Sequence, residues 1–332
     1  MIQQNMRSIK KLSAELLKEA IWSCCKVQPK TTTHSLFSSR RSGSTMLMEA
    51  IASNYEILPM GQPFASYSAS SMQLKQMLAF LQPHGHIIYP DQEASKHMLH
   101  YFDLLLKGEL IVGAPWRCWH HSFRRSSSRV ALKILAAKAV MEKLASHSGG
   151  SVVYSTRHPI PQSLSLMRNH WGLTVQAYLG NIKFIERELS QKQYDLCMDI
   201  VKNTSLLRKY VLNWVLENLM AIRAMSKHPE WLYLDYERCV LYPEESLQKL
   251  QQHLQLHDFE KMLAAIQKPS RSTRNASTSV TREKIATSDQ AYLVNRWRKD
   301  ISLDDELKAM QILEVFEIDL YRYGEDLPIC NV

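Results

Sequence analysis

Apolar residues along the chain fall into four short β-type runs, each next to a stretch with helical spacing. The runs cover residues 32–37, 129–135, 151–156 and 231–234. Helical spacing of apolar residues marks residues 49–54, 137–145, 162–169, 203–225 and 243–256. Strands that alternate with helices are typical of parallel βαβ units. We therefore predict an α/β fold, a three-layer sandwich whose central, mostly parallel sheet is flanked by many helices.

The same pattern predicts how the chain is divided. Residues 1–30 form a helical extension, with an amphipathic stretch at 13–21 that can pack on the body or touch a partner. Residues 31–332 form a single α/β domain, in which 66–128 is a variable helical insert on the acceptor side. Residues 268–289 are polar, hydroxyl-rich and basic, and we expect them to form a lid loop, since long loops in compact domains often close over sites.

Composition and charge narrow the class of ligand. Hydrophobic content is 45% and charged content 22%, as in globular proteins, and a net charge of +9 favours an anionic ligand. Basic residues are spread out, so nucleic acid is not expected. No apolar run reaches transmembrane length, which predicts no stable membrane insertion. The six cysteines form no CxxC pair and no zinc spacing, so we expect reduced thiols, no metal and a cytoplasmic protein; an oligomer is possible.

The most informative stretch is the hydroxyl-rich and basic turn at residues 37–46, between the first strand and a helix. Glycine, hydroxyl groups and the N–H groups of a helix start form an anion site, and two arginines add charge-assisted hydrogen bonds. The alternative is a serine-rich turn that caps a helix. No lysine follows the glycine, so a Walker A loop and a nucleotide kinase are disfavoured. The candidate residues are Arg40, Arg41, Ser42, Gly43, Ser44 and Thr45.

Two later segments have the same strand-to-helix character. Arg157 follows the strand at 151–156, Pro159 starts the next helix, and Ser165 lies two turns further on. Arg157 and Ser165 can grip one phosphate from two sides, whereas Arg157 alone is more often part of a surface ion pair. Tyr236 and Glu237 follow the strand at 231–234, where the alternative is an ordinary strand end with a solvated acid.

These three segments, in this order, resemble the sulfotransferases that use 3′-phosphoadenosine 5′-phosphosulfate (PAPS), over residues 35–323. Residues 41–45 match the family's 5′-phosphosulfate loop, Arg-Ser-Gly-Ser-Thr, one for one. Arg157, Pro159 and Ser165 match its 3′-phosphate motif, in which His158 replaces the usual aspartate. The resemblance implies a bacterial-type member with a P-loop-like nucleotide site, Tyr236 near the adenine, and Arg271 and Arg274 on a basic lid.

The resemblance also implies a reaction. A sulfuryl group passes in line from PAPS to a hydroxyl of a small molecule or glycan, and no metal is needed where cations stabilise the bridging oxygen. Arg41 takes that role, and Lys133 helps to hold the transferred group. Gln62 stands where some bacterial members have a glutamate, and an amide cannot accept the acceptor's proton as a base does.

The catalytic base is therefore open at the level of sequence. His121 is the candidate nearest in sequence to the expected position, beside His120. The absence of a catalytic base also fits an acceptor that is acidic enough to need little help, such as a phenol. It fits equally a non-catalytic nucleotide- or anion-binding protein on the same fold. Further histidine candidates are His84, His86, His97 and His100.

Overall fold

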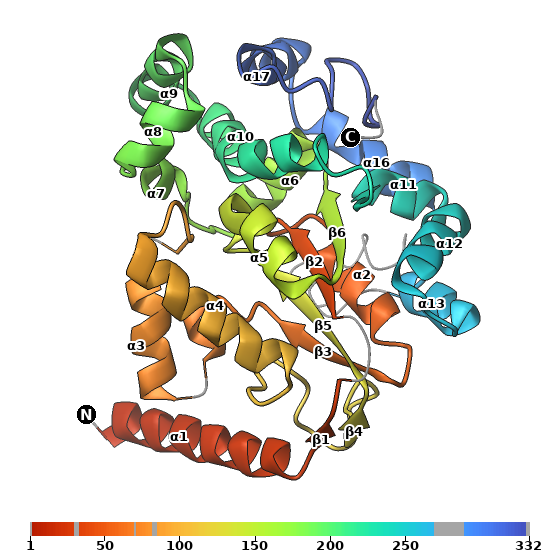
Figure 1. Cartoon of the computed structure of the whole chain (residues 1–332). Helices are drawn as coiled ribbons and strands as arrows, with labels where there is room; N and C mark the ends of the chain where they lie inside the picture. The colour runs from red at the N-terminus through yellow and green to blue at the C-terminus, as the bar shows by residue number, and fades with distance from the viewer. Residues whose placement is uncertain (1, 30–32, 70, 82–84, 269–288, 330–332) are drawn as a thin grey trace.

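A central sheet of five parallel strands forms the middle of the molecule, in the order β3-β5-β2-β6-β7 (Figure 1). The structure is a computed structural model that describes residues 2–29, 33–69, 71–81, 85–268 and 289–329. Every neighbouring pair in this sheet is parallel, so the predicted parallel α/β sheet is confirmed. The strands are β2 (His34–Ser38), β3 (Ile57–Gly61), β5 (Arg129–Ile134), β6 (Ser151–Thr156) and β7 (Leu232–Asp235).

Strand β3 is absent from the sequence prediction. It contains Pro59, which cannot donate to a ladder and therefore argues against a strand in a sequence pattern. The strand lies at one edge of the sheet and pairs only with β5 among the described strands. An edge position tolerates a proline, because one side of the strand needs no donors.

Side chains on alternate strand positions pack on opposite faces of the sheet. Val130, Leu132 and Ile134 join the core under α4 (Gln92–Leu106) and α5 (Met141–Ser148). Ala131 and Val153 point to the other face, which is covered by α2 (Ser44–Ile51), α12 (Pro243–Leu254) and α13 (Phe259–Ile266). Helices on both faces of one sheet confirm the predicted three-layer arrangement (Figure 1).

A separate apolar core holds a group of helices beside the sheet, with the buried face of α10 at its centre. The predicted helix over 203–225 is in fact the end of one helix and the whole of another, because Ser205 caps a new helix by accepting from the Arg208 N–H. These helices are α6 (Pro159–Arg168), α7 (Val175–Leu179), α8 (Ile182–Glu188), α9 (Gln191–Asn203), α10 (Leu206–Met225) and α17 (Leu303–Val315).

The N-terminal extension consists of α1 (Ile2–Ser23) and β1 (Lys26–Val27), which pairs in parallel with β4 (Ser126–Ser127). Figure 1 shows α1 along one edge of the molecule, away from the large sheet. Among the described residues, no helix combines the length and apolar character needed to cross a membrane. The remaining elements are η1 (Ser66–Ser68), α3 (Met72–Leu81), η2 (Lys138–Val140), α11 (Tyr236–Leu241), α16 (Gln290–Asn295) and η3 (Arg296–Lys299).

Two further segments were assigned functions in the sequence: an acceptor-side insert and a basic lid. The insert at 66–128 contains η1, α3, α4 and β4, joined by an irregular stretch before β4. The predicted lid at 268–289, with Arg271 and Arg274, lies almost entirely outside the described residues. Both remain predictions as functional assignments.

Candidate anion and acceptor site

The carboxyl ends of the parallel strands bring the candidate residues to one edge of the sheet. The anion loop follows β2, Arg157 follows β6, and Tyr236 follows β7. On the other side of β2, Lys133 is the penultimate residue of β5 and Gln62 follows β3. The Gln62 N–H donates to the Lys133 carbonyl at 2.8 Å. Ligands of open parallel sheets bind at this edge, so the topology alone assembles a site from five segments.

The loop between β2 and α2 is held by its own hydroxyl groups. The Ser38 and Ser42 hydroxyls lie 2.6 Å apart, and the Ser42 hydroxyl donates to the Ser39 carbonyl at 2.6 Å. Arg41 and Gly43 have φ values of 65° and 86°, in the left-handed region. Gly43 is also the N-cap of α2 and supplies no side-chain cap, so the first N–H groups of α2 remain for a ligand.

A side chain at position 43 would collide with the third motif. A Cβ built on Gly43 lies 2.6 Å from Cδ2 of Tyr236. The ring of Tyr236 also lies 4.3 Å from the guanidinium carbon of Arg157, which makes a cation–π contact. Glycine is therefore needed here for close approach as well as for backbone conformation.

Two arginines from the first and second motifs meet beside this loop. The Arg41 Nε donates to the Ser165 hydroxyl at 3.0 Å, and Arg157 Nη1 donates to the Arg41 carbonyl at 3.3 Å. Burial and the neighbouring Arg157 lower the pKa of the Arg41 guanidinium. Within the part of the chain that the structure describes, neither arginine forms an ion pair with a carboxylate, and the buried Arg157 Nε has no hydrogen-bond partner. Two adjacent cations in this state favour a bound anion.

Arg41 and Gly43 line a cavity of about 120 Å³, whereas Arg157, Ser165 and Tyr236 lie outside its lining. Lys133 reaches into it, and its Nζ donates to the Thr45 hydroxyl at 3.2 Å. Tyr67, from the predicted acceptor-side insert, donates to the Gln62 side-chain oxygen. The lining is rich in cations and hydroxyl donors, and consists of Arg40, Arg41, Gly43, Ser44, Thr45, Gln62, Tyr67, Lys133, Leu135 and Trp171.

Trp171, Tyr67 and Leu135 line the cavity but are absent from the candidate residues drawn from the sequence. Trp171 contacts an arginine of the anion loop. It follows the helix at 162–169, and its ring lies 5.8 Å from the Arg41 guanidinium carbon. The available signal was an aromatic residue before a glycine, directly after the helix that carries Ser165. That signal is weak by itself, because an aromatic residue after a helix is more often part of the core.

His121, the candidate base, lies elsewhere. It is exposed and outside the cavity lining. Its carbonyl accepts from Arg124 Nη1 at 2.9 Å, and Arg124 Nη2 donates to the Ala52 carbonyl at 2.5 Å, at the C-terminal end of α2. The anion loop is at the opposite end of that helix. The described cavity lining holds neither an imidazole nor a carboxylate.

His158 has a structural role at the start of α6. Its Nδ1 accepts from the Ile160 N–H at 3.3 Å and so caps α6. Burial lowers the pKa of His158 to about 3, so the ring is neutral and can accept. The ring stacks on Trp297 at 4.9 Å, and Trp214 Nε1 donates to the preceding carbonyl, of Arg157, at 2.9 Å. These contacts fix the backbone that carries Arg157.

Glu237 is buried, which overturns the alternative of a solvated acid at this strand end. Its two oxygens accept from the His158 N–H at 3.0 Å and from the Tyr321 hydroxyl at 3.1 Å. Burial, followed by the charge of Asp235, raises the pKa of Glu237 to about 7. The residue therefore ties β7 to the start of α6 beneath Arg157.

Comparison with known proteins gives matches among solved structures alone. No protein-family model matches the chain, and no curated protein does. The sulfotransferase domain from the curacin biosynthetic pathway is 16% identical, with a TM-score of 0.45, and the match covers 87% of this chain and 99% of that one. The sulfotransferase domain from the Synechococcus PCC 7002 olefin synthase is 16% identical, with a TM-score of 0.44 and coverage of 89% and 97%.

A third match is mouse sulfotransferase SULT7A1 complexed with PAP, at 14% identity and a TM-score of 0.41, covering 91% of this chain and 89% of that one. These solved structures are sulfotransferases, the family that the motifs resemble. At TM-scores below 0.5 the likeness carries no weight for the reaction or its ligands. In the described part of the chain, no group of three or more His, Cys, Asp or Glu side chains is placed to hold a metal ion.

Proposed function

We propose that this protein is a sulfotransferase that moves the sulfuryl group of PAPS to a hydroxyl of a small molecule or glycan. The observation that carries the proposal is the meeting of three motifs, distant in sequence, around the buried Arg157 and the half-buried Arg41. Neither arginine has a carboxylate partner in the described structure. Arg157 contacts Arg41 and Tyr236, and Arg41 contacts Ser165. A donor with anionic groups at both ends of a nucleoside fits this arrangement.

The residues fit the two ends of the donor separately. The N–H groups of α2, with Ser44 and Thr45, suit the 5′-phosphosulfate. Arg157, whose buried Nε has no partner, and Ser165 suit the 3′-phosphate. When bound, PAPS supplies an activated sulfuryl group with an adenosine bisphosphate leaving group.

The chain's own contribution is positioning and positive charge. Arg41 and Lys133 line the cavity beside Thr45 and offer donors where charge develops on the bridging and transferred oxygens. Gln62 and Tyr67 face the same cavity and can orient an acceptor hydroxyl. His121 has no part in this mechanism, because it lies beyond the far end of α2.

One observation favours a second candidate function. The described cavity lining has no imidazole or carboxylate that can take the acceptor's proton. A protein that binds the nucleotide without transferring sulfate needs no base. The alternative is therefore a non-catalytic nucleotide-binding protein on the same fold.

Ligand binding to a matched pair of variants tests the donor site. We expect Arg157→Ala to weaken binding of adenosine 3′,5′-bisphosphate by roughly 10- to 100-fold, since hydrogen bonds to charged groups contribute about 1.5–3 kcal/mol. Binding of 5′-AMP, which lacks the 3′-phosphate, should change by less than about threefold. Arg223→Ala is the control, because Arg223 forms a surface ion pair with Glu188. Equal losses for both nucleotides, measured by calorimetry, would contradict the assignment.

Transfer of labelled sulfate separates the two candidate functions. The wild-type protein is incubated with labelled PAPS and a panel of phenols, sugars and alcohols. Labelled product supports the sulfotransferase. Tight bisphosphate binding without any labelled product, even with the most acidic phenols, would favour the binding protein.

A further inference from the structure

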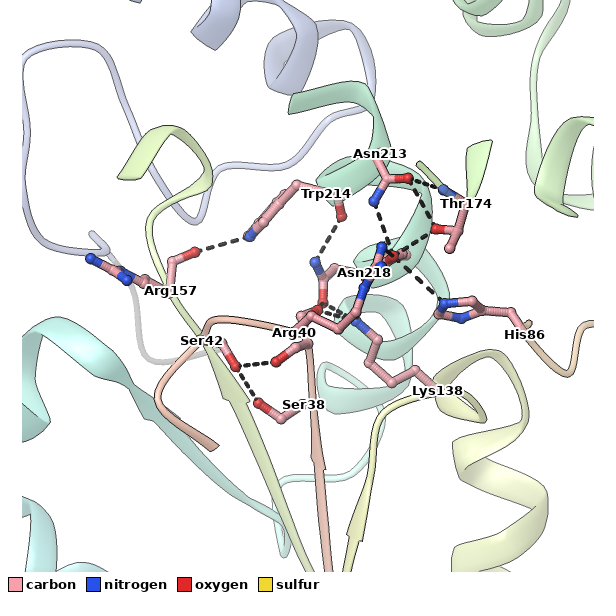
Figure 2. A network of polar contacts seen from close by, with 12 residues as sticks. Ser38, Arg40, Ser42, His86, Lys138, Arg157, Thr174, Asn213, Trp214 and Asn218 are labelled. Atoms are coloured by element: carbon pink, nitrogen blue, oxygen red, sulfur yellow. Dashed lines mark hydrogen bonds and ion pairs between the residues drawn. The ribbon is translucent and has the colours of Figure 1, made fainter. Parts of the chain in front are cut away.

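A buried carboxylate lies behind the anion loop, among three basic side chains from separate segments. Glu217 of α10 is 4% exposed. One of its oxygens lies 3.5 Å from Arg40 Nη2 and 3.6 Å from His86 Nε2, and the other lies 3.7 Å from Lys138 Nζ. Figure 2 shows Arg40, His86 and Lys138 converging on this region. Of the three, only Arg40 lines the cavity.

The charges in this cluster do not cancel. Burial alone would raise the pKa of Glu217, but the nearby His86, Lys138 and Arg40 hold it below its usual range. Burial lowers the pKa of His86 to about 4, so that ring is neutral near pH 7, and lowers the pKa of Lys138 to about 8. One carboxylate thus faces two cations, and the region behind the loop keeps a positive charge that favours an anion in front of it.

Glu217 also contacts the segment 171–174, which contributes Trp171 to the cavity lining. The Thr174 hydroxyl donates to it at 2.6 Å, and Asn213 Nδ2 donates at 3.0 Å. Asn213 in turn accepts from the Thr174 N–H at 2.6 Å (Figure 2). Arg40 Nη2 donates to the Gly172 carbonyl at 3.0 Å. The segment 171–174 is therefore held by hydrogen bonds to the Glu217 carboxylate and to Arg40, a partner of that carboxylate.

Asn218, the residue after Glu217 in α10, contacts Ser39, the residue before Arg40 in the loop. Asn218 accepts from the Ser39 hydroxyl at 3.1 Å and from Lys138 Nζ at 2.8 Å, and Lys138 also contacts the Ser39 hydroxyl. Two consecutive helix residues thus hold two consecutive loop residues. Helix α10 acts as a rigid support, because its neighbouring side chains fill the centre of an apolar core.

We infer that Glu217 is a positioning residue that sets Arg40 and the Trp171 segment for donor and acceptor. Buried ion pairs contribute little net stability, because desolvation offsets their attraction, and their better-attested role is to select one geometry. Among the described cavity-lining residues, Arg40 is the one that Glu217 contacts by an ion pair or hydrogen bond. Its effect on bisphosphate binding, as distinct from its hold on the segment 171–174, should therefore pass through Arg40. This inference rests on the proposed function for the identity of the ligand.

A double-mutant cycle tests that route. Glu217→Gln keeps the shape of the side chain and removes its charge; Arg40→Ala removes the guanidinium. We expect each to weaken binding of adenosine 3′,5′-bisphosphate by about tenfold, and the double variant to bind no more weakly than Arg40→Ala alone. Multiplied effects in the double variant would overturn the inference. So would a Glu217→Gln effect equal to that of Glu142→Gln, a control in an exposed ion pair with Lys227.

A second variant, Thr174→Val, and hydrogen exchange without ligand test the role of Glu217 independently of the double-mutant cycle. Thr174→Val removes one hydrogen bond to Glu217 without burying an unpaired charge, and should weaken binding in the same direction by about threefold. Amide hydrogen exchange at 171–174 in the ligand-free protein should quicken in both variants and stay unchanged in Glu142→Gln. Unchanged exchange would overturn the inference. If the wild-type protein fails to bind the bisphosphate, the proposed function fails, and the exchange measurement still decides the role of Glu217.

Discussion

Glu237 makes the stability of this protein depend on pH in a way that a single substitution removes. The carboxyl is buried and has a pKa of about 7 in the folded protein, against an ordinary value of 4.5. Below pH 4.5 both the folded and unfolded states hold the proton. Between pH 4.5 and 7 only the folded state holds it, so the free energy of unfolding falls as pH rises and the contribution is lost above about pH 7.

The size of this effect follows from the difference in pKa. At 1.36 kcal/mol per unit, a pKa of about 7 rather than 4.5 gives a loss of about 3 kcal/mol between pH 4.5 and pH 8. Glu237→Gln keeps the side-chain shape and carries no titratable group. Its oxygen can still accept from the His158 N–H, and the Tyr321 hydroxyl can rotate to accept from the amide.

The assay is urea denaturation followed by circular dichroism, for wild type and Glu237→Gln, at half-unit steps from pH 4.5 to 8. Other titrating groups cancel in the difference between the two proteins. We expect that difference to move by about 3 kcal/mol in favour of the variant as pH rises. Glu142→Gln, at an exposed site, is the control and should show no such movement. A difference for Glu237→Gln that stays constant within about 0.5 kcal/mol would refute the assigned burial and pKa.

Three further substitutions test the site. Gly43→Ala should destabilise the folded protein by at least about 1–2 kcal/mol because of the left-handed backbone at this position, and by more because the new methyl group contacts Tyr236. Thermal unfolding of the double variant with Tyr236→Ala should recover only the part that comes from this contact. Full recovery would contradict the backbone argument. Lys133→Ala should lower kcat by roughly 10²- to 10³-fold with a smaller change in bisphosphate affinity, whereas equal changes in both would make Lys133 a binding residue only. Trp171→Ala should raise the acceptor KM and leave bisphosphate affinity within about threefold; the reverse pattern would place Trp171 on the donor side.

The meeting of the loop after β2 with Arg157 was predictable because the signals of both segments are local. The turn after β2 and the Arg-His-Pro segment after β6 each show their chemistry within ten residues, and parallel strand ends bring such segments together. Strand β3 was not predictable, because Pro59 hides it. His121 was placed by its nearness in sequence to β5, yet the chain between them turns back along the far end of α2.

Glu217 could not have been found by pattern. It lies in the middle of a helix whose spacing indicates burial, and its partner Arg40 is 177 residues away in sequence. Trp171 presents a similar difficulty, since its one local signal, an aromatic residue before a glycine after a helix, is too weak to mark it as facing a cavity. The burial of Glu237 depends on Tyr321, from the far end of the chain. These roles follow from packing between distant segments, which short motifs do not encode.

The two neighbouring arginines at this site lower the free energy of unfolding of the ligand-free protein. Arg41 and Arg157 are held together, with no carboxylate paired to either in the described structure, and their mutual repulsion and burial oppose folding. In the proposed function, a bound dianion would compensate these buried charges, so ligand binding would raise the free energy of unfolding. At a ligand concentration 100 times the dissociation constant, the gain is about 2.7 kcal/mol. The same reasoning explains why Glu217 sits behind Arg40 instead of between Arg41 and Arg157. A carboxylate in that second position would stabilise the ligand-free protein and, in the proposed function, would compete with the donor's anionic groups for the two arginines.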